Sequence, residues 1–474
     1  MAQIAVPHPR RFWWLARLGV VGLFLLLILL GLRLWWGDAA QRRLDAEIAA
    51  AQARGEPALI DDFADPGADH PSDAQNAAVQ YTSAGAAINY NAAQTAFDNR
   101  FSSDTALSDT DCKILDGLIA ANAKTIALCR TAANLPRASW GLKLHSPVVN
   151  VMLPALNWQR AVANMLRYAQ VDHHLHGDDG QAVEDLRDIF CEADAVEHYG
   201  PFIVTHLVAI GINALGADSV ARLAGNLNIG PSGASVAAVQ RLIAQLVDDR
   251  EYRAAGERCW YGERLIAIDA NGTLGFTLPQ LRDNLLWPVQ PMLTLDQIRV
   301  FRYDTAVAHA MREPTFSTAS TKLPLLPLKG TFSPLYTAAH LYTLFVMPSV
   351  NRAVLTHYRG LTDRRAAAVL LAIRLYQVDH GAAPANLDLL VPAYLPVVPI
   401  DPFSKDGRQL RYIAKPGSEA VYSVGEDGHD DGGSTQLLRA ISGRTPGPWD
   451  TIDAVFPLHP APLLPPATEP TNEN

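Results

Sequence analysis

The pattern of hydrophobic and polar positions divides the chain into an apolar N-terminal segment, a long middle with a helical period, and a C-terminal part of mixed pattern. The uncharged run Leu18–Leu32 is by itself short for a bilayer core of roughly 30 Å. Arg17 and Arg33 can extend their side chains to the membrane interface, so the apolar segment lengthens to residues 12–36. This pattern predicts a transmembrane helix at 12–36.

Tryptophan pairs lie near both ends of the predicted span, Trp13-Trp14 before the apolar run and Trp35-Trp36 after it. Such pairs are typical of the aromatic belts of membrane proteins. A cleavable signal peptide is the alternative, but its cleavage site would need small residues and Trp35-Trp36-Gly37-Asp38 lacks them. The flanking arginines slightly favour a cytoplasmic N-terminus at residues 1–11. The segment Leu335–Met347 is too short for a second span. We therefore expect a single-pass protein whose body is extracytoplasmic.

Residues 37–312 follow a 3.6-residue hydrophobic period that glycine and proline interrupt, which predicts an α-helical domain. Residues 38–54 continue the membrane helix as a stalk, Gly55-Glu56-Pro57 ends it, and residues 61–73 form a loop. One amphipathic helix is predicted from the apolar positions Leu115, Leu118, Ile119, Ile126 and Cys129. Further helices fit residues 150–176, 181–198, 202–224 and 234–252. Their succession predicts a helical bundle or an irregular solenoid without a fixed repeat.

Three histidines lie where two of these predicted helices meet. His173, His174 and His176 precede Gly177, and a metal site completed by Asp172 or Asp178 is one interpretation. The other is structural, because histidines at a helix C-terminus interact favourably with the helix dipole. The structural interpretation is favoured, since no HExxH motif or distant third ligand accompanies the cluster.

Composition narrows the classes of function. A net charge of −9 without a long basic run argues against a nucleic-acid partner. Frequent alanine, and arginine in excess of lysine, suit a GC-rich bacterium. We therefore expect the predicted anchor to lie in a bacterial inner membrane. The sequence holds no GxSxG, P-loop, GxGxxG or kinase motif, so it supports no catalytic residue. The four cysteines form no CxxC pair, which favours free thiols over zinc or dithiol chemistry; they are Cys112, Cys129, Cys191 and Cys259.

The C-terminal part changes in character. Residues 313–359 form a connecting segment whose first half is rich in proline, serine and threonine. A smaller domain follows at 360–457, in which Thr362 can cap a helix that runs to His380. Two extended runs predict an antiparallel pair, Leu410–Ala414 and Glu419–Val424. The expected fold class is therefore mainly α with a small C-terminal α+β domain, followed by a disordered proline-rich tail at 458–474.

A series of short motifs runs through this small domain over about 95 residues. They are Ala372-Ile373-Arg374-Leu375-Tyr376, His380-Gly381, Pro384, Leu387, Leu390, Tyr394-Leu395, Pro399-Ile400-Asp401-Pro402-Phe403, Arg411-Tyr412 and Tyr422-Ser423-Val424-Gly425-Glu426-Asp427-Gly428. In order and spacing they resemble the globular domain of the major pseudopilin, the G subunit, of type II secretion systems. In that family a processed hydrophobic helix joins this domain directly, whereas here some 320 residues intervene. The resemblance therefore implies a borrowed module rather than the main pseudopilus subunit.

The resemblance also implies a Ca²⁺ site in the loop that follows the second extended run. Asp427 matches the family's position, and Asp430, Asp431, Asp450 and Asp453 are the further candidate ligands. Ca²⁺ takes six to eight oxygen ligands, and a glycine-rich loop can aim several of them at one point. A solvated acidic turn without a metal is the alternative. Within the Asp401-Pro402-Phe403 motif, Asp401 can cap the turn and Phe403 can pack between sheet and helix.

These observations lead to one functional hypothesis and two alternatives. We expect a non-enzymatic bacterial envelope protein that binds membrane lipid through its N-terminal helix and protein partners through its body. Association with a type II secretion or pilus-like assembly is expected from the resemblance alone. The alternatives are an enzyme, or a protein that binds a small envelope ligand, with the site among the helices of residues 37–312.

Overall fold

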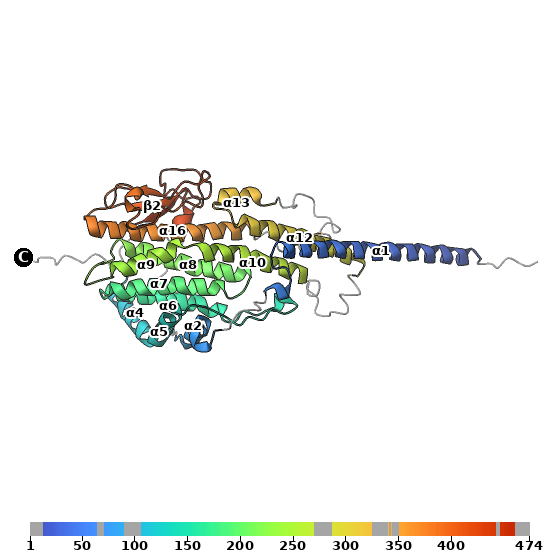
Figure 1. Ribbon diagram of the computed structural model, residues 1–474, viewed down its shortest axis with the longest axis horizontal. Helices are drawn as coiled ribbons and strands as arrows, with labels where there is room; N and C mark the ends of the chain where they lie inside the picture. Colours follow the sequence, from blue (N-terminus) through green and yellow to red (C-terminus); the bar gives the residue numbers. More distant parts are fainter. Residues whose placement is uncertain are drawn as a thin grey trace, which may run out of the picture.

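The fold is mainly helical, with a long apolar helix at the N-terminus and a small antiparallel sheet at the C-terminus, as the sequence predicts. Figure 1 shows helix α1 projecting from one end of an elongated helical body. The computed structural model describes residues 13–63, 71–89, 106–269, 287–324, 340, 343, 350–441 and 446–459.

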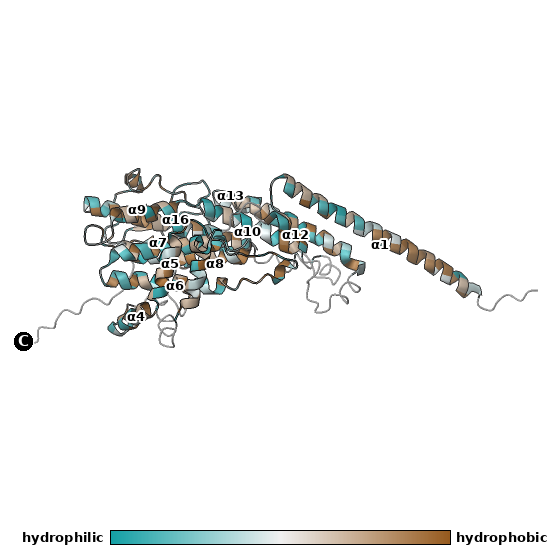
Figure 2. Ribbon diagram, turned by 60° about the horizontal axis from the view of Figure 1, so that its bottom comes forward, coloured by the Kyte–Doolittle hydropathy of each residue, from teal (hydrophilic) through white to brown (hydrophobic). Residues whose placement is uncertain are grey.

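Helix α1 (Trp13–Ala53) joins the predicted membrane segment and the predicted stalk in one continuous helix. Its outer part is hydrophobic, and the part beside the body is more hydrophilic (Figure 2). The helix ends in a Schellman turn, in which the N–H of Glu56 donates to the carbonyl oxygen of Ala51 at 3.1 Å. Gly55 has a φ of +76° in this turn, a conformation that glycine adopts without steric cost. The predicted end of the stalk is therefore confirmed.

The body is a stack of helices in which α8 and α16 run in the same direction, as the contacts His206–His357 and Asn213–Arg364 show. The helices predicted at 150–176, 181–198 and 202–224 are confirmed. The single helix predicted at 234–252 is wrong, because one helix ends at Val247 and the next begins at Arg250. Helix α6 packs on α7, α7 on α8, and α8 on α16, an order that Figure 1 shows from bottom to top. Three short helices lie outside α6 and α7, and α9 lies against α7 and α16. The bounds are α2 Ala77–Ala87, α4 Asp109–Ala121, α5 Ala123–Ala133, α6 Leu156–Leu175, α7 Asp179–Glu197, α8 Ile203–Ala224, α9 Val236–Val247 and α16 Val350–His380.

Helices α10 (Arg250–Asp269) and α12 (Gln290–Ala310) pair with each other, and α12 also packs along α1. This pair forms the end of the body from which α1 projects (Figure 1). Helix α8 is long and apolar enough to cross a membrane, but it is mostly buried inside the body, as a core helix is. The remaining short helices are η1 Ile60–Phe63, η2 Asp73–Gln75, η3 Val148–Asn150, η5 Trp287–Val289, α13 Phe316–Lys322, η7 Leu387–Leu390 and η8 Pro448–Asp450.

The single amphipathic helix expected around Leu115 and Cys129 is wrong, because the chain breaks at Asn122 into α4 and α5. The Asn122 amide donates to the carbonyl oxygens of Asn89 and Leu118 and accepts from the N–H of Asn89. A short amide side chain that bonds the backbone in this way competes with helix continuation. All four cysteines are free thiols, as expected.

Helix α16 begins at Val350, so the prediction that Thr362 caps it is wrong. Thr362 lies within the helix, and its hydroxyl donates to the carbonyl oxygen of Tyr358 at 2.9 Å. The turns before it are held by burial rather than by a capping signal, since the side chains of Val354, Tyr358 and Leu361 are fully buried. The predicted domain boundary at residue 360 therefore falls inside a continuous helix.

The sheet has three antiparallel strands in the order β1-β2-β3. Strands β1 (Arg411–Ile413) and β2 (Ala420–Ser423) match the two predicted runs, with Arg411 opposite Tyr422. Strand β3 (Ala454–Pro457) pairs with β2 and was not predicted, because residues 424–453 separate it from β2 and no short turn links the two strands in the sequence. Leu458 is buried and its N–H donates to the carbonyl oxygen of Glu419, so the predicted tail cannot begin there. Residues 460–474 lie outside the described residues.

The predicted roles of the Asp401-Pro402-Phe403 motif are confirmed. Asp401 accepts hydrogen bonds from the N–H groups of Phe403 and Val424, each at 2.9 Å. The Phe403 ring is 2% exposed and lies 5.5 Å from the ring of Phe316 in α13. The connecting segment thus includes a helix that packs on the small domain.

Candidate functional site

The joint between helix α1 and the body is built around a buried arginine. Arg264 of α10 has no exposed side-chain surface, and its Nη1 donates to Glu56 Oε2 at 3.0 Å. The same guanidinium donates to the carbonyl oxygen of Pro57 at 2.7 Å. It also stacks between the rings of Tyr261 and Phe301, 4.4 and 4.8 Å from their centroids. Residues from α10, α12 and the turn after α1 are thus fixed by one cation.

Glu56 is the carboxylate of this joint and is shared by two arginines and a histidine. Arg54 donates to it through two N–H groups at 2.9 and 3.0 Å, and His309 Nε2 of α12 lies 2.7 Å from Glu56 Oε1. Burial alone would raise the pKa of Glu56, but the hydrogen bonds from Arg54, His309 and Arg264 lower it to about 2. Glu56 is therefore ionised at neutral pH. We call Glu56, Arg264 and His309 the stalk clamp.

Further along α1, the stalk packs directly on α12. Ala51 of α1 and Ala58 contact the buried ring of Phe301, and Arg302 Nη2 lies 2.6 Å from Glu47 Oε1. The clamp and these contacts hold the polar half of α1 at one fixed position against the body. By contrast, the apolar half of α1 is exposed, since residues 13–32 bury no side chain.

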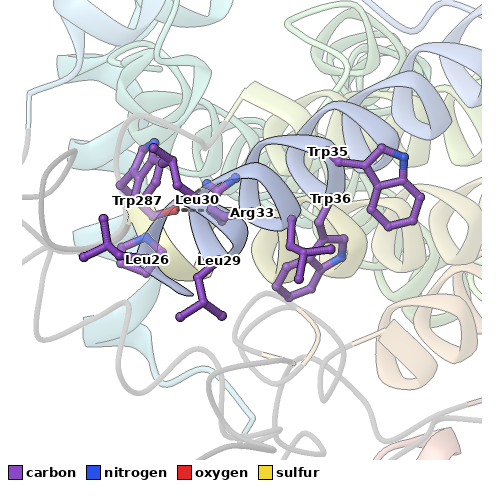
Figure 3. Close-up of a pocket in the computed structure, with 9 residues that line it drawn as sticks. Leu26, Leu29, Leu30, Arg33, Trp35, Trp36 and Trp287 are labelled. Atoms are coloured by element: carbon purple, nitrogen blue, oxygen red, sulfur yellow. Dashed lines mark hydrogen bonds between the residues drawn. The ribbon is translucent and has the colours of Figure 1, made fainter. Parts of the chain in front are cut away.

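A second contact between α1 and the body is made by Arg33, near the end of the apolar half of α1 (Figure 3). Arg33 donates from Nε to the carbonyl oxygen of Trp287 at 2.9 Å, and a second bond comes from its Nη2. The Arg33 guanidinium also stacks on the Trp287 ring at 4.7 Å. A Cβ at Gly37 would lie 2.6 Å from Arg33 Nη1, so this glycine leaves the space that the guanidinium fills.

An apolar crevice of about 720 Å³ lies between α1 and η5, the short helix that precedes α12. Arg33 contributes its one charged group. The lining residues are Leu26, Leu29, Leu30, Leu32, Arg33, Trp35, Trp36, Trp287 and Pro288, most of them labelled in Figure 3. A crevice of this size and chemistry can hold a hydrocarbon chain.

The predicted Ca²⁺ ligands lie in and near the loop after β2, and four of the five accept hydrogen bonds from backbone N–H groups. Asp453 is buried and accepts from the N–H groups of Gly433 and Ser434 at 2.8 and 2.9 Å. Asp430 accepts from Arg411 Nε at 2.6 Å, a cation that competes with a metal for the carboxylate.

The other three candidate ligands are Asp427, Asp431 and Asp450. Asp427 accepts from the N–H of His429, and Asp450 accepts from the N–H of Gly447, each at 2.9 Å. Asp431 is exposed, and its N–H lies 3.5 Å from Asp453 Oδ1. Among the described residues, the five aspartates form no group of three ligand atoms within 4.8 Å of one another. Ca²⁺ binding at this loop stays a prediction.

The histidine cluster connects α6 to α7. His173 Nδ1 lies 2.6 Å from Asp185, and His174 Nδ1 lies 2.6 Å from Asp179. The hydrogen bond to Asp185 raises the pKa of His173. His176 lies instead near Asp116 and Asp172, in a partly exposed group whose ligand atoms are within 4.8 Å of one another. His173 and His174 therefore bond aspartates of α7, whereas His176 Nδ1 lies 2.8 Å from the carbonyl oxygen of Asp172 in the last turn of α6, the kind of contact that the sequence predicted.

No pattern in the sequence predicted the buried, hydrogen-bonded chain of titratable groups where α7, α8 and α16 meet. Glu197 lies 2.9 Å from His206 Nδ1, and His206 Nε2 lies 2.9 Å from His357 Nδ1. Burial lowers the pKa of His357 well below its usual value and raises the pKa of Glu197. Tyr252 stacks on the His357 ring at 4.8 Å.

The sequence predicted neither the stalk clamp nor these buried titratable groups, because the residues that contact each other lie far apart in the sequence. Glu56 is 208 residues from Arg264 and 253 from His309, and no local motif relates residues so far apart. Comparison with known proteins adds no further signal: no family model, no curated protein and no solved structure matches the chain.

Proposed function

We propose that this protein is a single-pass membrane protein that holds a helical interaction body against the surface of a bacterial inner membrane, on the extracytoplasmic side. The proposal rests on one observation, which is that α1 consists of an apolar half and a polar half with different surroundings. Its apolar half is exposed around its circumference, as a helix surrounded by lipid would be. Its polar half is fixed to the body by the stalk clamp. Such a helix serves as an anchor and also sets the orientation of the body.

The small C-terminal domain supports a further part of the proposal. One long helix packed on a three-stranded antiparallel sheet is the arrangement that the pseudopilin resemblance implies. We therefore propose protein partners in the cell envelope, in a type II secretion or pilus-like assembly, with Ca²⁺ as a ligand of the loop after β2. Because α16 also packs on α8 and α9, the face of this domain left for a partner is its sheet and loops.

Membrane extraction and a topology reporter test the anchor. The full-length protein should remain in the membrane fraction after an alkaline carbonate wash, and a reporter fused after Asn474 should be active outside the cytoplasm. A matched variant with Leu25 and Leu29 changed to arginine should be released, because charged residues at the centre of a span oppose insertion. Release of the wild-type chain by carbonate, or a cytoplasmic reporter signal, would contradict the proposal.

The hydrogen-bonded chain from Glu197 to His357 is the observation that favours the enzyme alternative, because carboxylate–imidazole chains move protons in active sites. All three side chains are buried, so a substrate could reach them only if the helices open. Carbethoxylation of the folded protein, mapped by mass spectrometry, distinguishes the two hypotheses. We expect His198, which is 46% exposed, to react while His206 and His357 stay unmodified. Rapid modification of His357 in the folded protein would favour an enzyme.

A further inference from the structure

The position of Trp287 relative to α1 fixes how close the body comes to the membrane. Trp287 and Pro288 belong to the body, yet they line a crevice with Leu26, Leu29 and Leu30 of α1. Those leucines lie inside the segment that spans the bilayer in the proposed function. The body therefore does not stop at the tryptophan pair Trp35-Trp36 that marks the end of the span.

The depth of this contact follows from helix geometry. Leu26 precedes Trp35 by nine residues, which is roughly 14 Å along an α-helix. A bilayer core is roughly 30 Å thick, so the crevice lies beside the half of the span that belongs to the extracytoplasmic leaflet. Trp287 is 41% exposed and belongs to a side-chain type that is enriched at the depth of lipid headgroups.

We propose that η5 is seated in the outer leaflet, and that the acyl chain of a bilayer phospholipid occupies the crevice between α1 and Trp287. The inference rests on the proposed function, because it requires α1 to span the membrane. It adds a second membrane contact, made by the body itself. With two contacts, the body is held against the bilayer and cannot swing about a single helix.

Phospholipid is the occupant that the lining chemistry favours. The crevice walls on the α1 side are leucines that are 38–66% exposed, and lipid surrounds the same helix on its other sides. The carbonyl oxygen of Trp287 faces the crevice region, and it is satisfied by Arg33 (Figure 3). A buried carbonyl group without such a partner would be costly in hydrocarbon. The single charged side chain lies near the end of the span, where arginine can reach phosphate groups.

Fluorescence quenching by brominated lipid tests the inference on the full-length protein. The wild-type protein and the Trp287→Phe variant are reconstituted in vesicles of phosphatidylglycerol and phosphatidylethanolamine, with and without bromine on the acyl chains. In each kind of vesicle, subtracting the emission spectrum of the variant from that of the wild-type protein gives the emission of Trp287. We expect this emission to lose most of its intensity in brominated vesicles, and more with bromine near the carbonyl end than near the chain end.

Trp158 provides the matched control, because it is 55% exposed on α6 of the body. The emission that Trp158→Phe removes should be insensitive to brominated lipid and sensitive to aqueous iodide. Trp287 emission that iodide quenches and brominated lipid does not would overturn the inference. If the anchor itself fails, brominated lipid quenches none of the emission and the protein does not float with the vesicles, so the two failures are distinguishable.

Discussion

Helix α1 is held against the body by buried charged side chains, whereas helix α16 is held between the other helices and the sheet by small and branched apolar side chains. At the first joint Arg264, Glu56 and His309 form a hydrogen-bonded group. At the joint of α16, every residue from Ala366 to Ile373 is at most 1% exposed, although Arg364 and Arg365 precede this run.

The two joints have different roles. The joint at α1 sets the orientation of that helix, and the joint at α16 contributes to the stability of the fold. Buried ion pairs add modest net stability but depend strongly on geometry, so the stalk clamp defines a direction for α1. Close-packed apolar side chains carry most of the free energy of folding. The core around α16 joins residues of α7, α8 and α9 to residues of the sheet in one cluster. We therefore expect the helical stack and the small domain to unfold together, and the stalk to detach separately.

The largest effect is expected at the apolar joint. Phe403→Ala should lower the free energy of unfolding by roughly 3–5 kcal/mol, because it empties a buried site between Phe316 and Trp449. Urea unfolding of the detergent-solubilised protein measures the change. Val397→Ala is the control, since Val397 is 59% exposed and should change stability by less than about 0.5 kcal/mol. A loss confined to the sheet, with hydrogen exchange in α8 unchanged, would mean that the small domain folds alone.

An intermediate and local effect is expected at the stalk clamp. Arg264→Met should cost roughly 3 kcal/mol, at the low end for a broken buried ion pair, because Arg54 and His309 still contact Glu56. Hydrogen exchange should speed up in the second half of α1 and in residues 56–63, and stay unchanged in α8. Arg302→Met removes an arginine that is 65% exposed and should cost less than about 1 kcal/mol. Equal effects of the two variants would remove the distinction between the clamp and a surface pair.

A more gradual effect is a pH dependence from a carboxyl of α16, which changes stability by the smallest amount per step of one pH unit. Burial raises the pKa of Asp363 to about 7 from 3.8, although Trp449 Nε1–H donates to it. The folded state therefore keeps a proton that the unfolded state releases, so the free energy of unfolding falls as pH rises through this window. Asp363→Asn should remove a slope of at most about 1.4 kcal/mol per pH unit. Thermal melts of both proteins between pH 5 and 8 check this, and parallel curves would contradict it.

Much of the fold could be predicted from local patterns. The 3.6-residue period located α6, α7 and α8, and Gly55 marked the end of the stalk because a left-handed turn favours glycine. The pair β1 and β2 followed from two extended runs. The break at Asn122 and the start of α16 at Val350 were not predictable, since tertiary hydrogen bonds and burial decide both.

Much less of the candidate site could be predicted. The sequence pointed to aspartates around Asp427, and the structure shows these carboxylates bonded to backbone N–H groups of the same region. The joint at Glu56 and the crevice at Trp287 depend on contacts between residues more than 200 positions apart. Such contacts leave no periodic or motif signal in a single sequence.

Cysteine accessibility along α1 tests the central claim most directly, namely that one half of this helix is in the bilayer and the other half is in water beside the body. Single cysteines at Leu25 and Ala49 are introduced after replacing the four native cysteines, and intact spheroplasts are treated with a membrane-impermeant maleimide. Both positions are exposed on the isolated chain, so only the membrane distinguishes them. We predict rapid labelling of the Ala49→Cys protein and none of the Leu25→Cys protein until detergent is added. Equal labelling of both in intact spheroplasts would contradict the account.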